Sequence, residues 1–194
     1  MGRALALFLF LPLAWGQTVN CDAVDLRYDF SAPGPPLTLT VGGQPYYVAN
    51  LASYLLLLGG NGPMRFLPTE AVGGSGHRLA CTVTTPNRRG RRGGVCGARD
   101  DWCLRVTGVS GSLPVDWRAR LYVLVQVASG RATSHVTSPT LLDAVPDGRG
   151  LASVDRNATA TLHLYYWLEL WPGDTFPALP AGGTLTLTYE LERN

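Results

Sequence analysis

Short stretches in which apolar and polar residues alternate dominate this chain. They are Val24–Phe30, Leu37–Val41, Arg78–Thr84, Ala158–Leu170 and Gly183–Leu191. Further strands are expected over Cys103–Val109, over Trp117–Val127, which is dense in β-branched and aromatic side chains, and over the short Thr133–Ser138. A period of two is typical of a β-strand with one buried face. Gly42 to Gln44 predicts a turn from Leu37–Val41 into a second strand over Pro45–Val48. About eight to ten short strands separated by turns predict an all-β fold, an antiparallel Greek-key sandwich of the immunoglobulin-like type.

One segment, Asn50 to Leu58, has two interpretations. Asn50 is a good N-cap and Gly59 a good terminator, so the segment could form one short helix. A short apolar run has no readable period, however, so a fully buried strand is equally compatible with it.

Residues 1–16 have the pattern of a secretory signal peptide. Arg3 supplies a positive charge, Ala4–Ala14 is apolar, and Ala14 and Gly16 place small residues before Gln17. The run is shorter than the roughly 20 apolar residues that cross a bilayer, as is every later apolar run. We therefore expect a secreted chain of one domain over residues 17–194, extracellular, periplasmic or at the cell surface, with no membrane span. A buried N-terminal helix is the alternative.

Four cysteines follow the leader, an even number that predicts two disulfides in an oxidising compartment. We favour Cys96–Cys103, which closes a short loop, together with Cys21–Cys81. A Cys81–Cys103 bridge across the strands that flank an arginine-rich loop is the alternative. The spacings do not match the usual ligand pairs of zinc sites.

Charge is sparse, at 15% of residues, and every basic side chain other than histidine is arginine. The net charge of +2 is too small to indicate a nucleic-acid partner. Four arginines are concentrated in one loop, at Arg88, Arg89, Arg91 and Arg92. A solvated loop is the simplest interpretation; contact with an anionic glycan or a phosphate is the functional one.

Aromatic residues cluster near the end of the chain, and Tyr166, Trp167 and Trp171 are candidates for stacking on a sugar ring. Alternation sends Tyr166 and Trp167 to opposite faces of a strand, so part of this cluster is expected in the core. Asn157 begins an N-glycosylation sequon, Asn157-Ala158-Thr159.

Catalytic patterns are missing from the sequence. His77, His135 and His163 lack metal-ligand spacing, and neither a nucleophile elbow nor a phosphate-binding loop occurs. Asp100 and Asp101 alone supply too few oxygens for calcium. We therefore expect no enzyme activity, no metal and no cofactor.

The last fifth of the chain resembles the spore coat protein U family of secreted, pilin-like domains from archaic chaperone–usher pili. The matching residues are Thr161–Tyr165, Pro172-Gly173, Leu179–Gly182 and Thr184–Tyr189, with Cys21 ahead of Leu26–Phe30. The resemblance implies an incomplete sandwich that a neighbour's strand completes. Two features depart from the pattern. Only Gln17 to Asn20 separate the expected cleavage site from Cys21, where the family has a donor arm, and Cys96 and Cys103 are extra.

These observations together predict a non-enzymatic structural or adhesive protein of the cell surface, in its most specific form a pilus subunit or tip-like component. Its expected partners are other protein subunits, self or pilin-like, bound through edge strands, chiefly Gly183–Leu191. A carbohydrate- or anion-binding module is the alternative, and a secreted hydrolase is a distant third.

Overall fold

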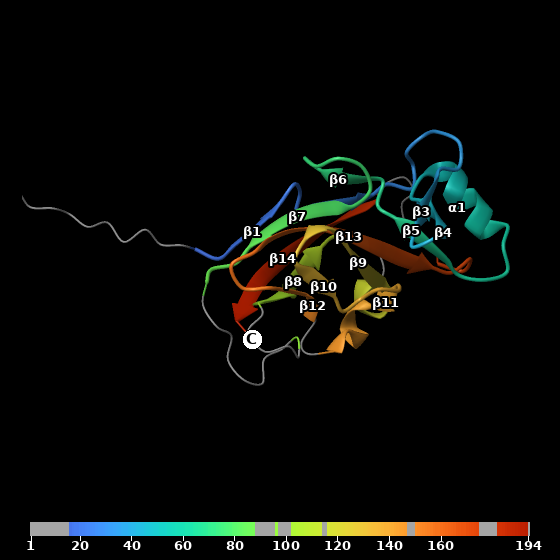
Figure 1. Ribbon diagram of the computed structural model, residues 1–194. Helices are drawn as coiled ribbons and strands as arrows, with labels where there is room; N and C mark the ends of the chain where they lie inside the picture. Colours follow the sequence, from blue (N-terminus) through green and yellow to red (C-terminus); the bar gives the residue numbers. More distant parts are fainter. Residues whose placement is uncertain are drawn as a thin grey trace, which may run out of the picture.

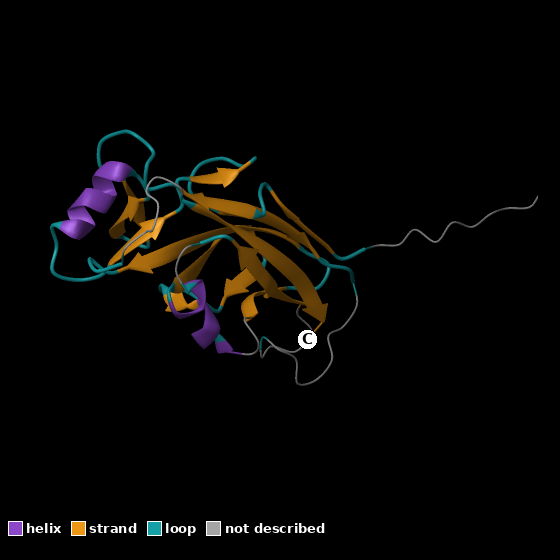
Figure 2. Ribbon diagram, turned by 180° about the vertical axis from the view of Figure 1, so that it is seen from behind, coloured by secondary structure: helices purple, strands orange, loops and turns teal. Residues whose placement is uncertain are grey.

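The structure is a computed structural model, and it describes residues 16–87, 96, 102–113, 116–146, 150–174 and 182–193. Within these residues the chain forms two β-sheets that pack face to face as a β-sandwich (Figures 1 and 2). The first sheet holds β1 (Thr18–Cys21), β3 (Thr38–Val41), β4 (Gln44–Val48), β5 (Met64–Leu67), β7 (Leu79–Thr84), β9 (Leu121–Gly130), β11 (Thr140–Leu141) and β13 (Thr159–Leu170). The second holds β2 (Asp25–Tyr28), β6 (Glu70–Val72), β8 (Trp102–Gly111), β10 (Ala132–Ser134), β12 (Gly150–Val154) and β14 (Gly183–Arg193).

The two longest strands organise the sheets. In the first sheet β13 pairs with β9 on one side and, on the other, with β7 along its first half and β5 at its end. In the second sheet the order is β10-β12-β8-β14-β2-β6. All of these pairs are antiparallel; β4 and β5 form a short parallel pair. The expectation of an antiparallel-rich β-sandwich is thus confirmed.

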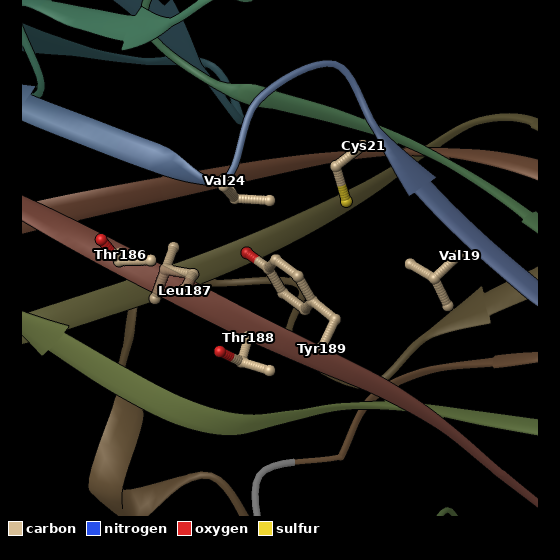
Figure 3. Close-up of a pocket in the computed structure, with 7 residues that line it drawn as sticks. All are labelled: Val19, Cys21, Val24, Thr186, Leu187, Thr188 and Tyr189. Atoms are coloured by element: carbon tan, nitrogen blue, oxygen red, sulfur yellow. The ribbon is translucent and has the colours of Figure 1, made fainter.

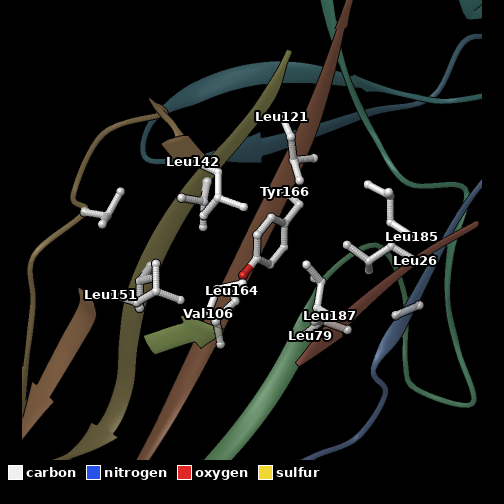
Figure 4. Close-up of a cluster of buried hydrophobic side chains, with 14 of the residues drawn as sticks. Leu26, Leu79, Val106, Leu121, Leu142, Leu151, Leu164, Tyr166, Leu185 and Leu187 are labelled. Atoms are coloured by element: carbon white, nitrogen blue, oxygen red, sulfur yellow. The ribbon is translucent and has the colours of Figure 1, made fainter. Parts of the chain in front are cut away.

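Apolar side chains from both sheets meet in one core, shown in Figure 4. Its members include Leu26, Leu79, Val106, Leu121, Leu142, Leu151, Leu164, Tyr166, Leu185 and Leu187, each at most 2% exposed. Burying a leucine completely stabilises a fold by about 1.5–3 kcal/mol, so alternation along these strands accounts for the sheets' packing.

The ambiguous segment forms a helix, α1 (Leu51–Leu58). The Asn50 side chain accepts a hydrogen bond from the Ser53 amide at 2.7 Å and donates one to the Pro35 carbonyl at 2.9 Å. Gly59 ends the helix. Ser53, Tyr54 and Leu57 are buried, whereas four leucines stay at least 42% exposed: Leu51, Leu55, Leu56 and Leu58. Capping rather than amphipathic spacing therefore defines this helix. Two 3-10 turns, η1 (Trp117–Ala119) and η2 (Leu142–Ala144), flank β9 and β11.

The predicted hairpin of β3 and β4 is confirmed, and it covers part of the outer face of the first sheet. Gly42 and Gly43 turn the chain with φ values of 59° and 81°, a conformation that glycine adopts without strain. Val41 and Val48 then pack with Leu124, Tyr165 and Trp167 in a second apolar cluster. The end of β13 is consequently buried on both faces.

The N-terminal part of the chain is shared between the sheets. β1 pairs with β7 in the first sheet, while β2, four residues further on, pairs with β14 in the second. The disulfide Cys21–Cys81 joins directly opposite residues of β1 and β7. Cys96 bonds Cys103 at the start of β8. Both favoured pairings are confirmed, and they fit an oxidising environment.

Candidate functional site

The position of β14 corrects one expectation. The sequence suggested Gly183–Leu191 as an edge strand, but β14 lies inside the second sheet, between β8 and β2. β8 pairs with it from Leu185 to Arg193. β2 pairs only with Gly183 to Thr186, because the chain preceding β2 leaves this sheet to form β1. One side of β14 is therefore open only along its second half.

A groove of about 320 Å³ lies beside this open half, between β14 and β1 (Figure 3). Apolar groups dominate its walls. The lining residues are Val19, Cys21, Val24, Thr186, Leu187, Thr188 and Tyr189. Val24, just ahead of β2, is 47% exposed, the largest apolar exposure among them.

Backbone groups of β14 point into the groove. The Leu187 amide donates to the Val24 carbonyl at 2.9 Å, the last contact that continues the β2 ladder. Residues two apart in a strand direct their backbone groups to the same side, so those of Tyr189 and Leu191 face the open side. There the Gln17 side-chain nitrogen donates to the Leu191 carbonyl at 3.3 Å. This single side chain substitutes for a neighbouring strand.

Tyr189, which lines the groove, is linked by hydrogen bonds to tyrosines of the core. The Tyr166 and Tyr189 hydroxyls are hydrogen-bonded at 2.9 Å, and the Tyr28 hydroxyl donates to the Tyr166 carbonyl at 3.4 Å. Burial raises the pKa of all three phenols well above the ordinary value, and the Tyr189–Tyr166 proximity adds to the rise at Tyr189. These phenols are consequently neutral up to strongly alkaline pH, and Tyr189 brings no charge to the groove.

The aromatic residues named from the sequence occupy different positions. Tyr166 lies in the main core and Trp167 in the second cluster, both fully buried, so neither can stack on a sugar at the surface. Tyr166 and Trp167 do lie on opposite faces of β13, as alternation predicted, but the β3–β4 hairpin covers the face that carries Trp167, so both faces are buried. Trp171, just beyond β13, is 50% exposed.

The remaining sequence candidates fall into two groups. Arg88, Arg89, Arg91 and Arg92 lie outside the described residues, as do Asp100 and Asp101. Asn157 is exposed in a turn with φ of 50°, which leaves its sequon accessible.

Each histidine interacts with a different part of the sandwich. His77 Nδ1 lies 3.0 Å from the Pro68 carbonyl, and His135 Nε2 lies 3.1 Å from Ser153 Oγ. Burial, followed by the charge of Arg78, lowers the pKa of His163. Within the described residues no group of three or more histidine, cysteine or acidic side chains could hold a metal ion.

The sequence named the strand Gly183–Leu191 and Cys21, which line the groove, but not the groove itself, nor Val19 and Val24 as part of it. Alternation predicts which residues of one strand share a face, but not where a neighbouring strand ends. The sequence offered one signal: Gly183–Leu191 is longer than Val24–Phe30, and a shorter partner leaves part of a longer strand unpaired. Only the strand pairing seen in the structure shows which part of Gly183–Leu191 is left open.

Comparison with known proteins gives no family. No family model matches the chain, and no curated protein or solved structure matches it either. No helix in the described ranges has both the length and the apolar character to cross a membrane.

Proposed function

We propose that this chain is a secreted structural or adhesive protein of the cell surface, with a Greek-key, immunoglobulin-like sandwich that accepts an extended strand from another protein. A pilus subunit or tip-like component is the most specific form of this proposal. The observation that carries it is the second half of β14, where outward-facing backbone groups border an apolar groove.

An extended polypeptide fits this site because it can pair with the open backbone groups of β14 and at the same time cover the apolar walls of the groove. Its backbone can hydrogen-bond to Tyr189 and Leu191, and alternate side chains can enter a groove that already contains Val24 and Leu187. Unpaired strand edges are avoided in proteins that have no partner for them. A small ligand would cover the apolar walls but leave the backbone groups of the strand unpaired.

The incoming strand must replace the Gln17 contact, since that side chain lies across the open edge. A neutral side chain–backbone hydrogen bond contributes only about 0.5–1.5 kcal/mol, so a peptide that makes two or more backbone bonds outweighs it. The Cys21–Cys81 bond keeps β1 on β7 meanwhile, so only the side chain of Gln17 needs to move.

The test uses the oxidised, secreted protein and a peptide of alternating valine and threonine. We expect the peptide to raise the melting temperature and to slow hydrogen exchange at the Tyr189 and Leu191 amides. A matched peptide with a central proline, which removes a backbone donor, is the control. Equal effects of the two peptides, or no added protection at these amides, would contradict the proposal.

Two valines provide a matched pair of variants. Val24 is 47% exposed in the groove, and Val127 is 37% exposed on β9, which lies on the opposite side of β13 from β7 and β1. Val24→Asp should weaken peptide binding about tenfold, because it removes roughly one apolar side chain's contact. Val127→Asp should leave binding unchanged, and equal loss in both variants would place the peptide elsewhere.

A further inference from the structure

A second hollow, of about 290 Å³, lies where β4 and β5 separate. These strands pair only at Tyr47–Phe66 and Val48–Leu67, so the chain on either side of those pairs diverges. Pro45, Tyr46 and Tyr47 of β4 line one side, with the Tyr46 side chain packed toward Trp167 and that of Tyr47 toward the main core, and Met64, Arg65 and Glu169 contribute to the rest. This end of the molecule also carries α1, and it lies away from β1 and the C-terminal end of β14 (Figure 1).

The charged side chains of the hollow hold each other in place but keep hydrogen-bonding atoms that a ligand can use. Arg65 Nε donates to Glu169 Oε2 at 2.9 Å, and the guanidinium lies 3.8 Å from the centre of the Tyr122 ring. Among the described residues, no hydrogen-bond partner is found for the terminal nitrogens of Arg65, for Glu169 Oε1, or for the hydroxyls of Tyr46 and Tyr47. The Arg65 side chain is 35% exposed and the Glu169 side chain is 14% exposed, so a ligand can reach both without breaking the ion pair.

Aromatic rings support the wall from behind. The Tyr46 ring lies 4.8 Å from that of Trp167, which in turn stacks with Tyr165 at 6.1 Å. Trp167 is fully buried, so Tyr46 rests on a rigid base while its outer side remains half-buried. An aromatic surface held this way loses little conformational freedom when it binds a ligand.

We propose that this hollow binds a neutral saccharide, with a pyranose ring against Tyr46. The ring's C–H face is apolar and suits an aromatic wall. Its hydroxyls can accept from the Arg65 terminal nitrogens and donate to Glu169 Oε1. The Arg65–Glu169 pair has no net charge, which favours a neutral sugar over an anionic one.

This site is independent of the strand-accepting groove, which lies on other elements. Saccharide binding therefore tests nothing about β14, and loss of one function leaves the other in place. The two together would suit an adhesive protein that is held by one site and binds a surface glycan by the other.

The experiment titrates the oxidised protein with cellohexaose, maltohexaose and hexa-N-acetylchitohexaose, followed by calorimetry and tryptophan fluorescence. A heparin hexasaccharide serves as the anionic comparison. We expect at least one neutral oligosaccharide to bind with a dissociation constant at or below the millimolar range. Absence of binding by all three neutral probes, or binding of heparin alone, overturns the proposal.

Matched glutamate variants locate the binding. Glu169→Gln keeps the shape of the side chain and removes its charge from the hollow. The control, Glu192→Gln, removes a carboxylate charge in the same way from a different ion pair, Arg105–Glu192, which joins β8 and β14. We expect about tenfold weaker binding in Glu169→Gln and no change in Glu192→Gln. Arg65→Lys, which keeps the charge but loses the planar fork, should weaken binding similarly. Unchanged binding in both hollow variants overturns the assignment.

Discussion

Single residues show how this sandwich uses tyrosine. Tyr28, Tyr166 and Tyr189 come from three strands; the Tyr166 and Tyr189 hydroxyls are hydrogen-bonded to each other, and the Tyr28 hydroxyl is hydrogen-bonded to the Tyr166 backbone carbonyl. Such groups must find partners within the protein, because burying an unpaired hydroxyl is costly. The Tyr166 and Tyr189 hydroxyls pair with each other and the Tyr28 hydroxyl pairs with a backbone carbonyl, so two hydrogen bonds join β13 of the first sheet to β14 and β2 of the second.

The first prediction concerns alkaline pH. Each of the three phenols has a raised pKa when folded, while the unfolded chain releases its protons near pH 10, the ordinary value. Stability is therefore undiminished below about pH 10 and falls above it. Tyr28→Phe should cost about 0.5–1.5 kcal/mol at neutral pH but reduce the alkaline loss by about 1.4 kcal/mol per pH unit.

Denaturant unfolding followed by circular dichroism at pH 8 to 11.5 would measure this difference, with the range set by the ordinary tyrosine value of about 10. Parallel curves for the variant and the parent protein would show that Tyr28 titrates normally in the folded state.

Secondary-structure elements were predicted with uneven success, and the reason is physical. Strands with one buried face, such as β7, show alternation and were found. β12 is buried at all five positions and β5 is only four residues long, so neither has a readable period. The end of β13 alternates correctly, yet both of its faces are covered. Burial by a distant hairpin could not be derived from the strand's own sequence.

The second prediction concerns the end of β9. Gly130 has φ of 86°, and a Cβ there would lie 2.2 Å from the Thr159 carbonyl of β13. Gly130→Ala should therefore destabilise the fold by at least about 2 kcal/mol through strain and the clash combined. Thermal melting measures the loss. Gly62→Ala is the control, since nothing lies within 4 Å of its added Cβ. Comparable melting temperatures for the two variants would refute this account.

At the scale of the whole molecule, two disulfides add covalent links to the hydrogen bonds of the sheets. Cysteine number and spacing allowed the pairing to be favoured from sequence, because a short loop and one long-range bridge use all four residues. The candidate groove could not be derived in the same way. It arises from the transfer of the chain between sheets at Asp22 to Val24, which no local pattern encodes.

The third prediction ranks the disulfides. Cys21–Cys81 spans 60 residues and Cys96–Cys103 spans 7. Loop-closure entropy assigns about 4 kcal/mol to the longer bridge and about 2.5 kcal/mol to the shorter. Replacing both cysteines of each pair by alanine should therefore lower stability more at Cys21–Cys81. Urea unfolding of the two double variants tests this order, and a reversed order would mean that native contacts of the shorter loop dominate.

The crosslink between β1 and β7 also determines how the protein would carry mechanical load. A pull on the chain ahead of Cys21 can peel away only Thr18 to Asn20 before it meets the covalent bond to Cys81. From there tension passes into β7, and β7 is held lengthwise against β13 from Thr159 to Leu164. Force applied at this end would thus be resisted in shear by the centre of the first sheet, after the peeling of Thr18 to Asn20 has removed part of one wall of the groove.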